Sequence, residues 1–205
     1  MKVNGTAVIK YVYHFTRLQN LDSILLEGLM SRQDLDSCEW DTPPAINDPY
    51  RFDNCLDAIC CSIGHPNYKM FYRLRQQYKG EEWVVLGLKA RILWEKDCAF
   101  CVENAASNNV TSIPIEERRS LDAFNQLFEE YDGKPSREDL GIPNKCPTHP
   151  QAEILVFENI EPEYIIGAVF ESRQRVDEYR TQYDDFQFMY HKAPFKPRGD
   201  YEHWR

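Results

Sequence analysis

An apolar run near residue 155 begins with a single carboxylate. The segment 151–157 is rich in strand formers and follows Pro147 and Pro150, so it predicts a buried strand with Glu153 at its open end. A carboxylate held by a rigid strand just after a loop is well placed to act as a catalytic acid or base. The alternative is a glutamate at the strand edge that points into water.

Two further side chains are of types that can bind a ligand. His14 lies near the end of the alternating stretch 11–15, which predicts a strand, and leucines at helical spacing follow over 18–28. A histidine at such a junction can bind a ligand through one ring nitrogen while a backbone group fixes the other. Arg51 ends a long polar loop, where its guanidinium can hold a phosphate or a base edge. A structural histidine and a solvated arginine are the alternatives.

A basic stretch over residues 68–79 carries Lys69, Arg73, Arg75 and Lys79 without an acidic residue. Aromatic side chains lie between these cations, and a nucleic-acid groove needs both, because cations bind phosphates and rings stack on bases. The same pattern also fits an amphipathic helix whose charged face is solvated. The inner face of that helix is expected to be Met70, Phe71, Leu74 and Tyr78.

Composition describes a folded chain of 205 residues, with 42% hydrophobic and 13% aromatic residues, and predicts one domain over residues 1–205. The formal net charge of −9 argues against a protein that binds nucleic acid or membrane by bulk charge, although it is compatible with a local basic groove. No apolar run reaches the length of a membrane span, and the N-terminus lacks the apolar core of a signal peptide. We therefore expect a cytoplasmic protein without membrane association.

The cysteines do not form a disulfide framework. There are seven, an odd number, and Cys60 and Cys61 are adjacent, so free thiols in a reducing compartment are the simpler account. Cys98 and Cys101 form a C-x-x-C pair, but no second pair with metal-ligand spacing accompanies it. We therefore expect no bound metal.

Strands and helices must position these residues. Residues 31–54 and 132–150 are polar, turn-rich loops, and loops of this length are often functional. Thr16 and Gln19 match a capping box, which predicts a helix start at Thr16, and Gly28 suits the helix C-terminus. Strands are also expected over 56–63, 83–88, 98–102, 165–170 and 186–190, and helices over 115–131 and 172–182. The core stripe expected in the first of these helices is Leu121, Phe124, Leu127 and Phe128.

The order of these elements favours an α+β fold with antiparallel sheets, because strands and helices do not alternate regularly. No Gly-x-Gly-x-x-Gly follows a strand and no Gly-x-x-x-x-Gly-Lys is present, so neither a Rossmann nor a P-loop site is supported.

Several of these segments together resemble a known family. In this order, residues 13–16, 18–28, Arg51, 104–107 and 151–156 resemble the DarT family, toxins that ADP-ribosylate nucleobases in single-stranded DNA. The resemblance implies an ADP-ribosyltransferase-like fold, a split pair of small antiparallel sheets with flanking helices and an NAD cleft. It also implies NAD as the ADP-ribose donor and a mechanism that needs no metal.

The resemblance implies a role for each candidate residue. Glu153 and Arg51 would be catalytic, and His14 would hydrogen-bond the ribose on the nicotinamide side. A carboxylate can accept a hydrogen bond from the ribose 2′-hydroxyl, stabilise an oxocarbenium-like ribose and take a proton from the attacking base. The implied cofactor-binding residues are His14, Thr16, Asn20 and Tyr72, the last by stacking on nicotinamide. The implied acceptor-binding residues are Lys69, Arg73, Arg75, Asn104 and His149, with 132–150 as the recognition loop.

We therefore expect an NAD-dependent ADP-ribosyltransferase that modifies a nucleobase in single-stranded nucleic acid, with DNA favoured over RNA. The resemblance implies a toxin of a toxin–antitoxin or phage-defence system, with an antitoxin of the macrodomain type. Residues 62–72 and 146–149 depart from the best-known members, which leaves the base and the choice of DNA or RNA open. The alternatives are transfer to RNA or protein, simple NAD hydrolysis, and a catalytically inactive nucleic-acid-binding module.

Overall fold

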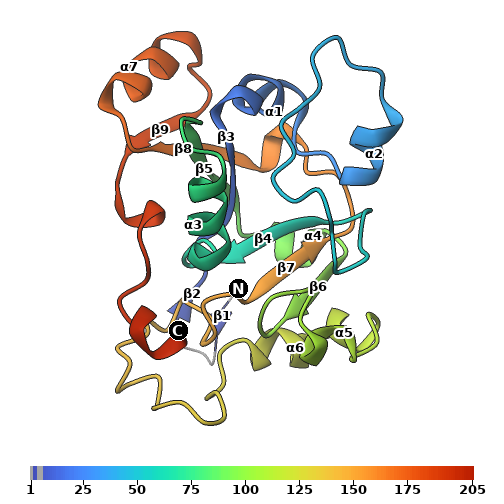
Figure 1. Ribbon diagram of the computed structural model, residues 1–205, viewed down its shortest axis with the longest axis vertical. Helices are drawn as coiled ribbons and strands as arrows, with labels where there is room; N and C mark the ends of the chain where they lie inside the picture. The colour runs from blue at the N-terminus through green and yellow to red at the C-terminus, as the bar shows by residue number, and fades with distance from the viewer. Residues whose placement is uncertain (1, 4–6) are drawn as a thin grey trace.

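The computed structural model describes residues 2–3 and 7–205. Residues 1 and 4–6, part of the N-terminal stretch from which we judged export, lie outside the described residues. The strands are β1 (Lys2–Val3), β2 (Ala7–Val8), β3 (Tyr11–Arg17), β4 (Ile59–Ile63), β5 (Trp83–Lys89), β6 (Cys98–Cys101), β7 (Glu153–Val156), β8 (Ile165–Phe170) and β9 (Gln187–Tyr190). Within the described ranges, seven of them form one sheet in the order β6-β7-β4-β3-β5-β8-β9, while β1 pairs with β2 (Figure 1).

Helices lie at both ends of this sheet and against its middle strands. They are α1 (Leu21–Glu27), α2 (Arg32–Ser37), α3 (Tyr68–Gln77), α4 (Ile92–Glu95), α5 (Asn108–Thr111), α6 (Leu121–Gln126) and α7 (Arg173–Gln182). Figure 1 shows α7 and α1 at the end with β8 and β9, and α5 and α6 at the other end, near β6. None of the described helices is both long and apolar enough to cross a membrane.

The pairing between neighbouring strands is shortest at the centre of the sheet, between β3 and β4. β3 pairs with β5 along its whole length, from Tyr11–Lys89 to Arg17–Trp83. With β4 it pairs only through Val12–Ile63 and Tyr13–Ser62. The predicted α+β class is confirmed, whereas the sheet is single and not split, because these two residue pairs join its halves. Its last pair, β8 with β9, is parallel.

β5 supplies side chains to cores on both faces of the sheet, because successive residues of a strand point to opposite faces. Val84, Leu86 and Leu88 belong to the larger core. Trp83 and Val85 pack on the other face with Phe71 and Leu74 of α3. Burial of one such aliphatic side chain contributes about 1.5–3 kcal/mol, so this second core holds α3 against β3 and β5.

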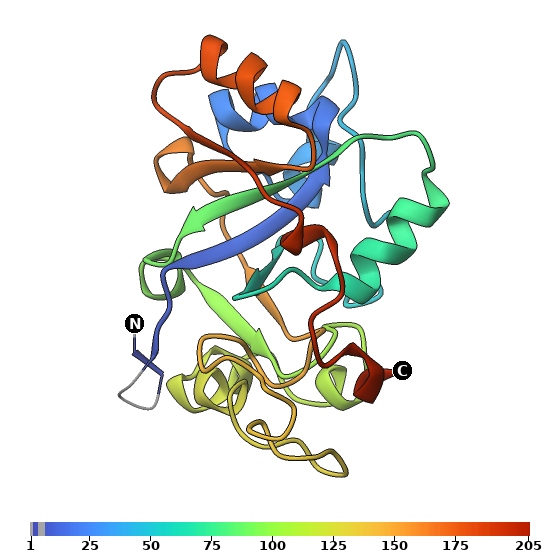
Figure 2. The same ribbon diagram turned by 90° about the vertical axis from the view of Figure 1, so that its left-hand side faces the viewer.

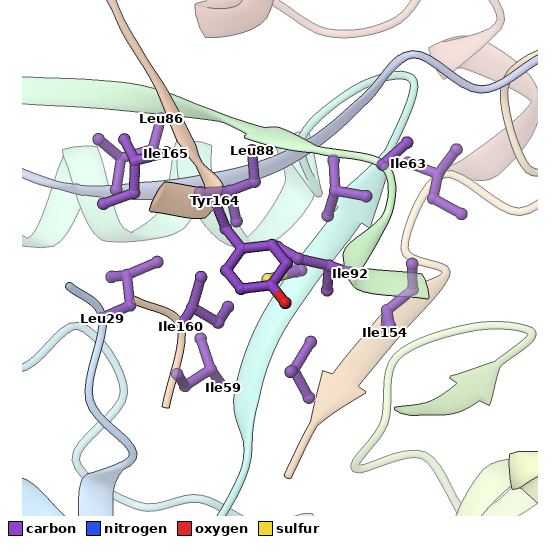
Figure 3. Close-up of a cluster of buried hydrophobic side chains, with 14 of the residues drawn as sticks. Leu29, Ile59, Ile63, Leu86, Leu88, Ile92, Ile154, Ile160, Tyr164 and Ile165 are labelled. Carbon is purple, nitrogen blue, oxygen red and sulfur yellow. The ribbon is translucent and has the colours of Figure 1, made fainter. Parts of the chain in front are cut away.

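Figure 3 shows part of the larger core, where side chains of several strands meet those of connecting segments. The labelled residues are Leu29, Ile59, Ile63, Leu86, Leu88, Ile92, Ile154, Ile160, Tyr164 and Ile165. Ile154 follows Glu153 directly and is 1% exposed, so the strand that carries the carboxylate is anchored in this core. Figure 2 shows β3 and β5 side by side across the molecule, with α7 at one end and the recognition loop at the other.

The start of the first long helix differs from the prediction. β3 continues through Thr16 to Arg17, because β5 pairs with it that far, and a 3₁₀ turn over Leu18–Asn20 precedes α1. The Thr16 hydroxyl accepts a hydrogen bond from the Asn20 amide and caps no helix. Gly28 ends α1 as predicted, with φ of +93°, and an added Cβ there would lie 2.3 Å from the carbonyl oxygen of Ile160.

Three further elements also differ. The loop predicted over 31–54 contains the short helix α2, whose N-terminus is capped by the Ser31 hydroxyl. The helix predicted over 115–131 is interrupted, because Ser120 adopts an extended backbone and caps a new helix, α6. Leu121 is 63% exposed and therefore lies outside the core stripe. The strand predicted over 56–63 begins only at Ile59.

Candidate active site

A cavity of about 480 Å³ opens where β3 and β4 diverge. Its walls are β3 residues 13–16, β4 residues 59–62, the segment 104–106 with Glu153, residues of α1 and α2 and their adjoining turns, Met70, and residues of the connection 38–58. We call this connection the cover loop. Cavities of this volume are typical of small-molecule and cofactor sites.

Glu153 is the first residue of β7 and is 5% exposed. Its Oε1 accepts a hydrogen bond from the Asn67 amide at 3.0 Å. Its Oε2 accepts from the backbone N–H of Ala105 at 2.8 Å and from the Asn104 amide at 3.2 Å. These donors hold the carboxylate in one orientation at the cavity wall, so the alternative of a solvated edge glutamate is wrong. Since a carboxylate oxygen can accept two hydrogen bonds, Oε1 has one site left.

Burial is the largest influence on this carboxylate and raises the pKa of Glu153 to about 7. The hydrogen bonds from Ala105 and Asn67 act in the opposite direction, because they favour the ionised form. The negative charge of Asp53 raises the pKa further, and the positive charge of Arg51 lowers it. Glu153 is therefore able both to accept and to release a proton near neutral pH.

His14 lies on β3 and lines the cavity. Its Nδ1 is 2.9 Å from the backbone oxygen of Cys60, and since a carbonyl can only accept, Nδ1 carries the hydrogen. Burial lowers the pKa of His14, against the effect of this hydrogen bond, and the charge of Arg51 lowers it further. The ring is therefore neutral near pH 7, and Nε2 is a hydrogen-bond acceptor.

Thr16 and Asn20 also line the cavity, but their polar groups already have partners. Asn20 donates to the Thr16 hydroxyl at 2.9 Å and to the backbone oxygen of Ala45 at 2.9 Å. Its own side-chain oxygen accepts from the backbone N–H of Ala45 at 2.8 Å. Asn47 extends this attachment by donating to the backbone oxygen of Phe15 at 2.9 Å. In this conformation, Thr16 and Asn20 therefore hold the cover loop against β3.

Arg51 lies at the cavity wall with its guanidinium fully engaged. Nε and Nη2 bind the two carboxylate oxygens of Asp53 at 3.0 and 2.9 Å, and Nη1 donates to Ala58 O at 2.6 Å. Nη2 also donates to the backbone oxygen of Cys55. The residue adopts φ of +42°, in the left-handed region that is uncommon for a side chain of this size. It is 8% exposed, so the alternative of a solvated arginine is wrong. The guanidinium is also not free to hold a phosphate or a base edge in this conformation, because its N–H groups already have partners.

Helix α3 makes a smaller contribution to the cavity than predicted. Of its described residues, Met70 alone lines the cavity. Tyr72 is 63% exposed on another side of the helix, so the structure does not support its stacking on nicotinamide. Lys69 donates to the backbone oxygen of Trp204. Arg75 binds Glu171 at 2.5 Å and Phe195 O at 3.0 Å.

These contacts change how the basic stretch is interpreted. Lys69 and Arg75 hold the C-terminal segment and are not free to bind an acceptor in this conformation. Arg73 is exposed and stays a predicted contact for nucleic acid. The predicted inner face is correct for Phe71 and Leu74, which are buried, whereas Met70 is only half-buried because it borders the cavity.

The last two predicted acceptor-binding residues are Asn104 and His149. Asn104 contacts the carboxylate directly, and its side-chain oxygen accepts from the backbone N–H of Ala106 at 3.1 Å. His149 packs between Tyr131 and Trp204. Burial, the largest influence, lowers the pKa of His149 to about 4, so the ring is neutral near pH 7.

Two functional side chains were missed from the sequence. Asn67 is the N-cap of α3, since its side chain accepts from the backbone N–H of Met70, and it also donates to Glu153. An asparagine directly before the helical stretch was the available signal for the cap, but nothing local pointed to Glu153. Asp53 is the partner of Arg51, and its spacing of two residues was the available signal.

All seven cysteines are free, as predicted. Cys98 and Cys101 are buried at the two ends of β6. Over residues 2–3 and 7–205, no group of three or more His, Cys, Asp or Glu side chains is arranged to hold a metal ion.

The sequence comparison identifies one family. The family model described as "ssDNA thymidine ADP-ribosyltransferase, DarT" matches residues 13–201, nearly the whole chain. The match includes the cavity, Glu153 and the recognition loop. No curated protein sequence matches the chain.

Solved structures of the same fold exist from two organisms. Thermosipho africanus DarTG in complex with ADP-ribose superposes with a TM-score of 0.61 at 17% identity. It covers 90% of this chain, which spans only 50% of the DarTG chain. Thermus sp. 2.9 DarT in complex with ADP-ribosylated ssDNA has a TM-score of 0.62 at 15% identity, covering 91% of this chain and 96% of that one. The same protein with carba-NAD+ has a TM-score of 0.60 at 15% identity, covering 93% and 100%. At these identities the likeness shows the fold alone.

Proposed function

The chain belongs to the DarT family of single-stranded-DNA ADP-ribosyltransferases, and we propose that it uses Glu153 to transfer ADP-ribose from NAD to a base. The observation that carries this proposal is the geometry of Glu153. A nearly buried carboxylate is held by Asn67, Asn104 and Ala105 at the wall of a cofactor-sized cavity, with its pKa raised to about 7. Groups with such shifted pKa values, held in clefts, are typical of active sites.

NAD binds, in this proposal, along β3 and under the cover loop. His14 is neutral and offers Nε2 as an acceptor, which suits a ribose hydroxyl as donor. Thr16 and Asn20 act on NAD through the cover loop that they hold, and through their own polar groups if the loop moves on binding. The Thermus sp. 2.9 structures with NAD+ and carba-NAD+ support this choice of donor.

Glu153 acts on both partners of the reaction. The bond between the ribose C1′ and the nicotinamide nitrogen breaks, and nicotinamide leaves with the bonding electrons. The ionised Glu153 accepts a hydrogen bond from the ribose 2′-hydroxyl at the free site of Oε1 and stabilises the positive charge on the ribose. A ring nitrogen of the base then bonds to C1′, and Glu153 takes its proton.

Arg51 has a supporting role in this proposal. Its positive charge lowers the pKa of Glu153 and so offsets part of the rise that the negative charge of Asp53 and burial cause. Because Asp53 and two backbone oxygens hold the guanidinium, Arg51 contributes as a fixed positive charge at the cavity wall. A fixed charge needs no reorganisation during the reaction, which is the feature that makes such groups effective.

The acceptor is single-stranded DNA and the base thymidine in this proposal, following the family description and the Thermus sp. 2.9 complex with ADP-ribosylated ssDNA. Arg73, Asn104 and the recognition loop are the proposed contacts. We propose a toxin role with a macrodomain antitoxin, supported by the likeness to Thermosipho africanus DarTG, of which this chain spans half. A single domain over residues 1–205, a cytoplasmic location and a metal-free mechanism stay predictions.

Mass spectrometry of short oligonucleotides tests the proposal. The protein is incubated with NAD and with DNA or RNA oligonucleotides that differ in a single base. We expect a gain of one ADP-ribose unit on DNA that contains thymidine, and no gain with Glu153→Gln, whose melting temperature is measured to confirm folding. A gain on RNA alone or on protein would mean that RNA or protein, and not DNA, is the acceptor. Nicotinamide release without transfer would indicate a glycohydrolase. Intact NAD with the wild-type protein would overturn the proposal in favour of a binding module.

A further inference from the structure

The segment 195–204, which we call the tail, lies between helix α3 and the recognition loop. Figure 1 shows it in red beside the yellow-orange loop. Three of its side chains are deeply buried although they are polar or large: Arg198 is 8% exposed, Asp200 4% and Trp204 4%. Buried polar groups require partners, and here these partners lie in the recognition loop and within the tail itself.

Arg198 joins the tail to the end of the recognition loop. Its Nη1 donates to the backbone oxygen of Pro147 at 2.7 Å and its Nη2 to that of Thr148 at 2.6 Å. Asp200 binds the same guanidinium at 2.6 Å through each carboxylate oxygen and also accepts from the Trp204 indole at 2.6 Å. One arginine thus fixes two successive carbonyl groups of the loop, and Asp200 fixes the arginine.

Trp204 adds ring and apolar contacts between the tail and the recognition loop. Its ring packs edge-on against His149 with centroids 4.8 Å apart and against Tyr131 at 5.4 Å. It shares a small hydrophobic core with Leu140, Ile142 and Cys146 of the recognition loop. This core belongs to the loop and the tail, and is separate from the larger core of the sheet.

The other face of the tail is held by α3 and the turn before it. Lys69 donates to the backbone oxygen of Trp204, Arg75 to that of Phe195 at 3.0 Å, and His65 lies 2.9 Å from that of Lys196. Two of the cations that made residues 68–79 resemble a nucleic-acid groove therefore bind the tail.

The recognition loop ends close to the reacting carboxylate. Only three residues separate His149 from Glu153. His149 Nδ1 accepts from the backbone N–H of Gln151 at 3.2 Å, so its hydrogen is on Nε2, which lies 3.9 Å from Glu103. Glu103 precedes Asn104, which donates to Glu153. The position of His149, which packs against Trp204, is thus linked through Glu103 and Asn104 to the Glu153 carboxylate.

We propose that the tail, through Trp204 and Arg198, is a positioning element that presets the recognition loop for the acceptor strand and leaves NAD binding untouched. The inference rests on the proposed function, because that function makes 132–150 the acceptor loop. Within the part of the chain that the structure describes, no residue of the tail or of the recognition loop lines the cavity. A loop ordered before binding saves the entropy that a mobile loop would lose on binding.

Two activities separate this role from a merely structural one. Nicotinamide release without oligonucleotide reports NAD cleavage, and ADP-ribose transfer reports acceptor use. We expect Trp204→Ala to lower kcat/KM for the oligonucleotide by about 100-fold, because small misplacements of reacting groups have effects of this size. The KM for NAD and the rate of nicotinamide release are expected to remain at wild-type values. Trp204→Phe, which retains a ring but loses the bond to Asp200, should restore part of the transfer.

The controls make each outcome decisive. Arg205→Ala removes an exposed neighbour, 70% exposed, and should match the wild type in both activities. If Trp204→Ala does not fold, Arg198→Lys replaces it, since a lysine cannot bind two carbonyl groups and Asp200 together. Equal loss of both activities, or no loss of transfer, would overturn the inference while the proposed function stands. A wild-type protein that transfers nothing to DNA would instead overturn the proposed function and the inference with it.

Discussion

Two buried arginine–aspartate pairs with the same spacing serve different regions of this molecule. Arg51 binds Asp53 in the cover loop, and Arg198 binds Asp200 in the tail, each through both carboxylate oxygens. Each arginine also donates to two backbone carbonyls. The carbonyls bound by Arg51 are four and seven residues away, whereas those bound by Arg198 are 50 and 51 residues away.

The difference shows how one local motif acquires two functions. Arg51 and Asp53 both line the cavity, so the pair that folds the cover loop also sets the charge around Glu153. Arg198 and Asp200 lie away from the cavity and join two segments distant in sequence. We therefore expect a ligand in the cavity to affect the first pair and not the second.

The largest expected effect is on folding stability when one acid is removed from either pair. We expect Asp53→Ala and Asp200→Ala each to lower the free energy of unfolding by about 3–5 kcal/mol, because each leaves a buried guanidinium without its counter-ion. Urea denaturation measures this loss. The exposed Asp57→Ala is the matched control and should change stability by less than about 0.5 kcal/mol.

The affinity for NAD should differ between Asp53→Ala and Asp200→Ala. Asp200→Ala should bind NAD as the wild type does, measured by calorimetry where the variant is folded, whereas Asp53→Ala should bind more weakly. Equal NAD affinity for both variants would remove the proposed distinction between the two regions.

Substitution of the arginines is expected to affect activity rather than folding. Arg51→Lys should lower the rate of NAD cleavage by about 100-fold, since the compact ammonium group cannot keep the charge in the same place. Arg198→Lys should leave NAD cleavage unchanged and reduce transfer. Nicotinamide release measured in the absence of DNA compares the two, and a similar rate for both variants would count against the assignment of Arg51 to the active site.

A smaller effect is expected where the cover loop meets β3. Asn20→Ala removes both bonds to the backbone of Ala45, which should raise the KM for NAD by about tenfold, the equivalent of one lost hydrogen-bond pair. Hydrogen exchange at the Ala45 amide should become faster, while amides of the recognition loop keep their protection. Unchanged exchange at Ala45 would show that other contacts hold the loop.

The smallest expected effect is a shift in pH dependence. If Glu153 reacts in its ionised form, kcat/KM should fall as the pH drops below about 7, the pKa of this carboxyl in the folded protein. Asn67→Ser retains a helix cap but is too short to reach Glu153, so the ionised form loses a donor and the pKa rises. The acid limb should therefore move to higher pH, by up to about one unit. A limb that moves to lower pH would contradict this account.

The folding stability of the protein should also depend on pH through the titration of Glu153. The pKa of Glu153 in the folded protein, about 7, lies above its ordinary value of 4.5. The folded state therefore binds this proton more tightly than the unfolded state does, and the resulting stability is complete below pH 4.5 and is lost as the pH rises toward 7. Glu153→Gln should lack this contribution, so between pH 4.5 and 7 its stability should fall less, or rise more, with pH than that of the wild type, which thermal melting at several pH values measures.

Much of the fold was predictable because it depends on local patterns. The alternation in residues 11–15 and the apolar runs at 165–170 and 154–156 are strands in the structure. The strand that carries Glu153 and the loop before it were therefore identified. The errors at Thr16 and Ser120 have different causes. Pairing with β5 extended a strand through a capping box, and an extended serine interrupted a helical pattern.

The sequence by itself determined most of the elements and the family, because helical and strand periodicity and short motifs are local properties. Only the tertiary structure decided what each polar side chain does. Asn67 and Asn104 reach Glu153 from 86 and 49 residues away. Lys69 meets the tail from 135 residues away, and Arg51 turns to Asp53 rather than to solvent. A buried charge must find a partner, and which partner it finds depends on the packing of distant segments, which no local pattern contains.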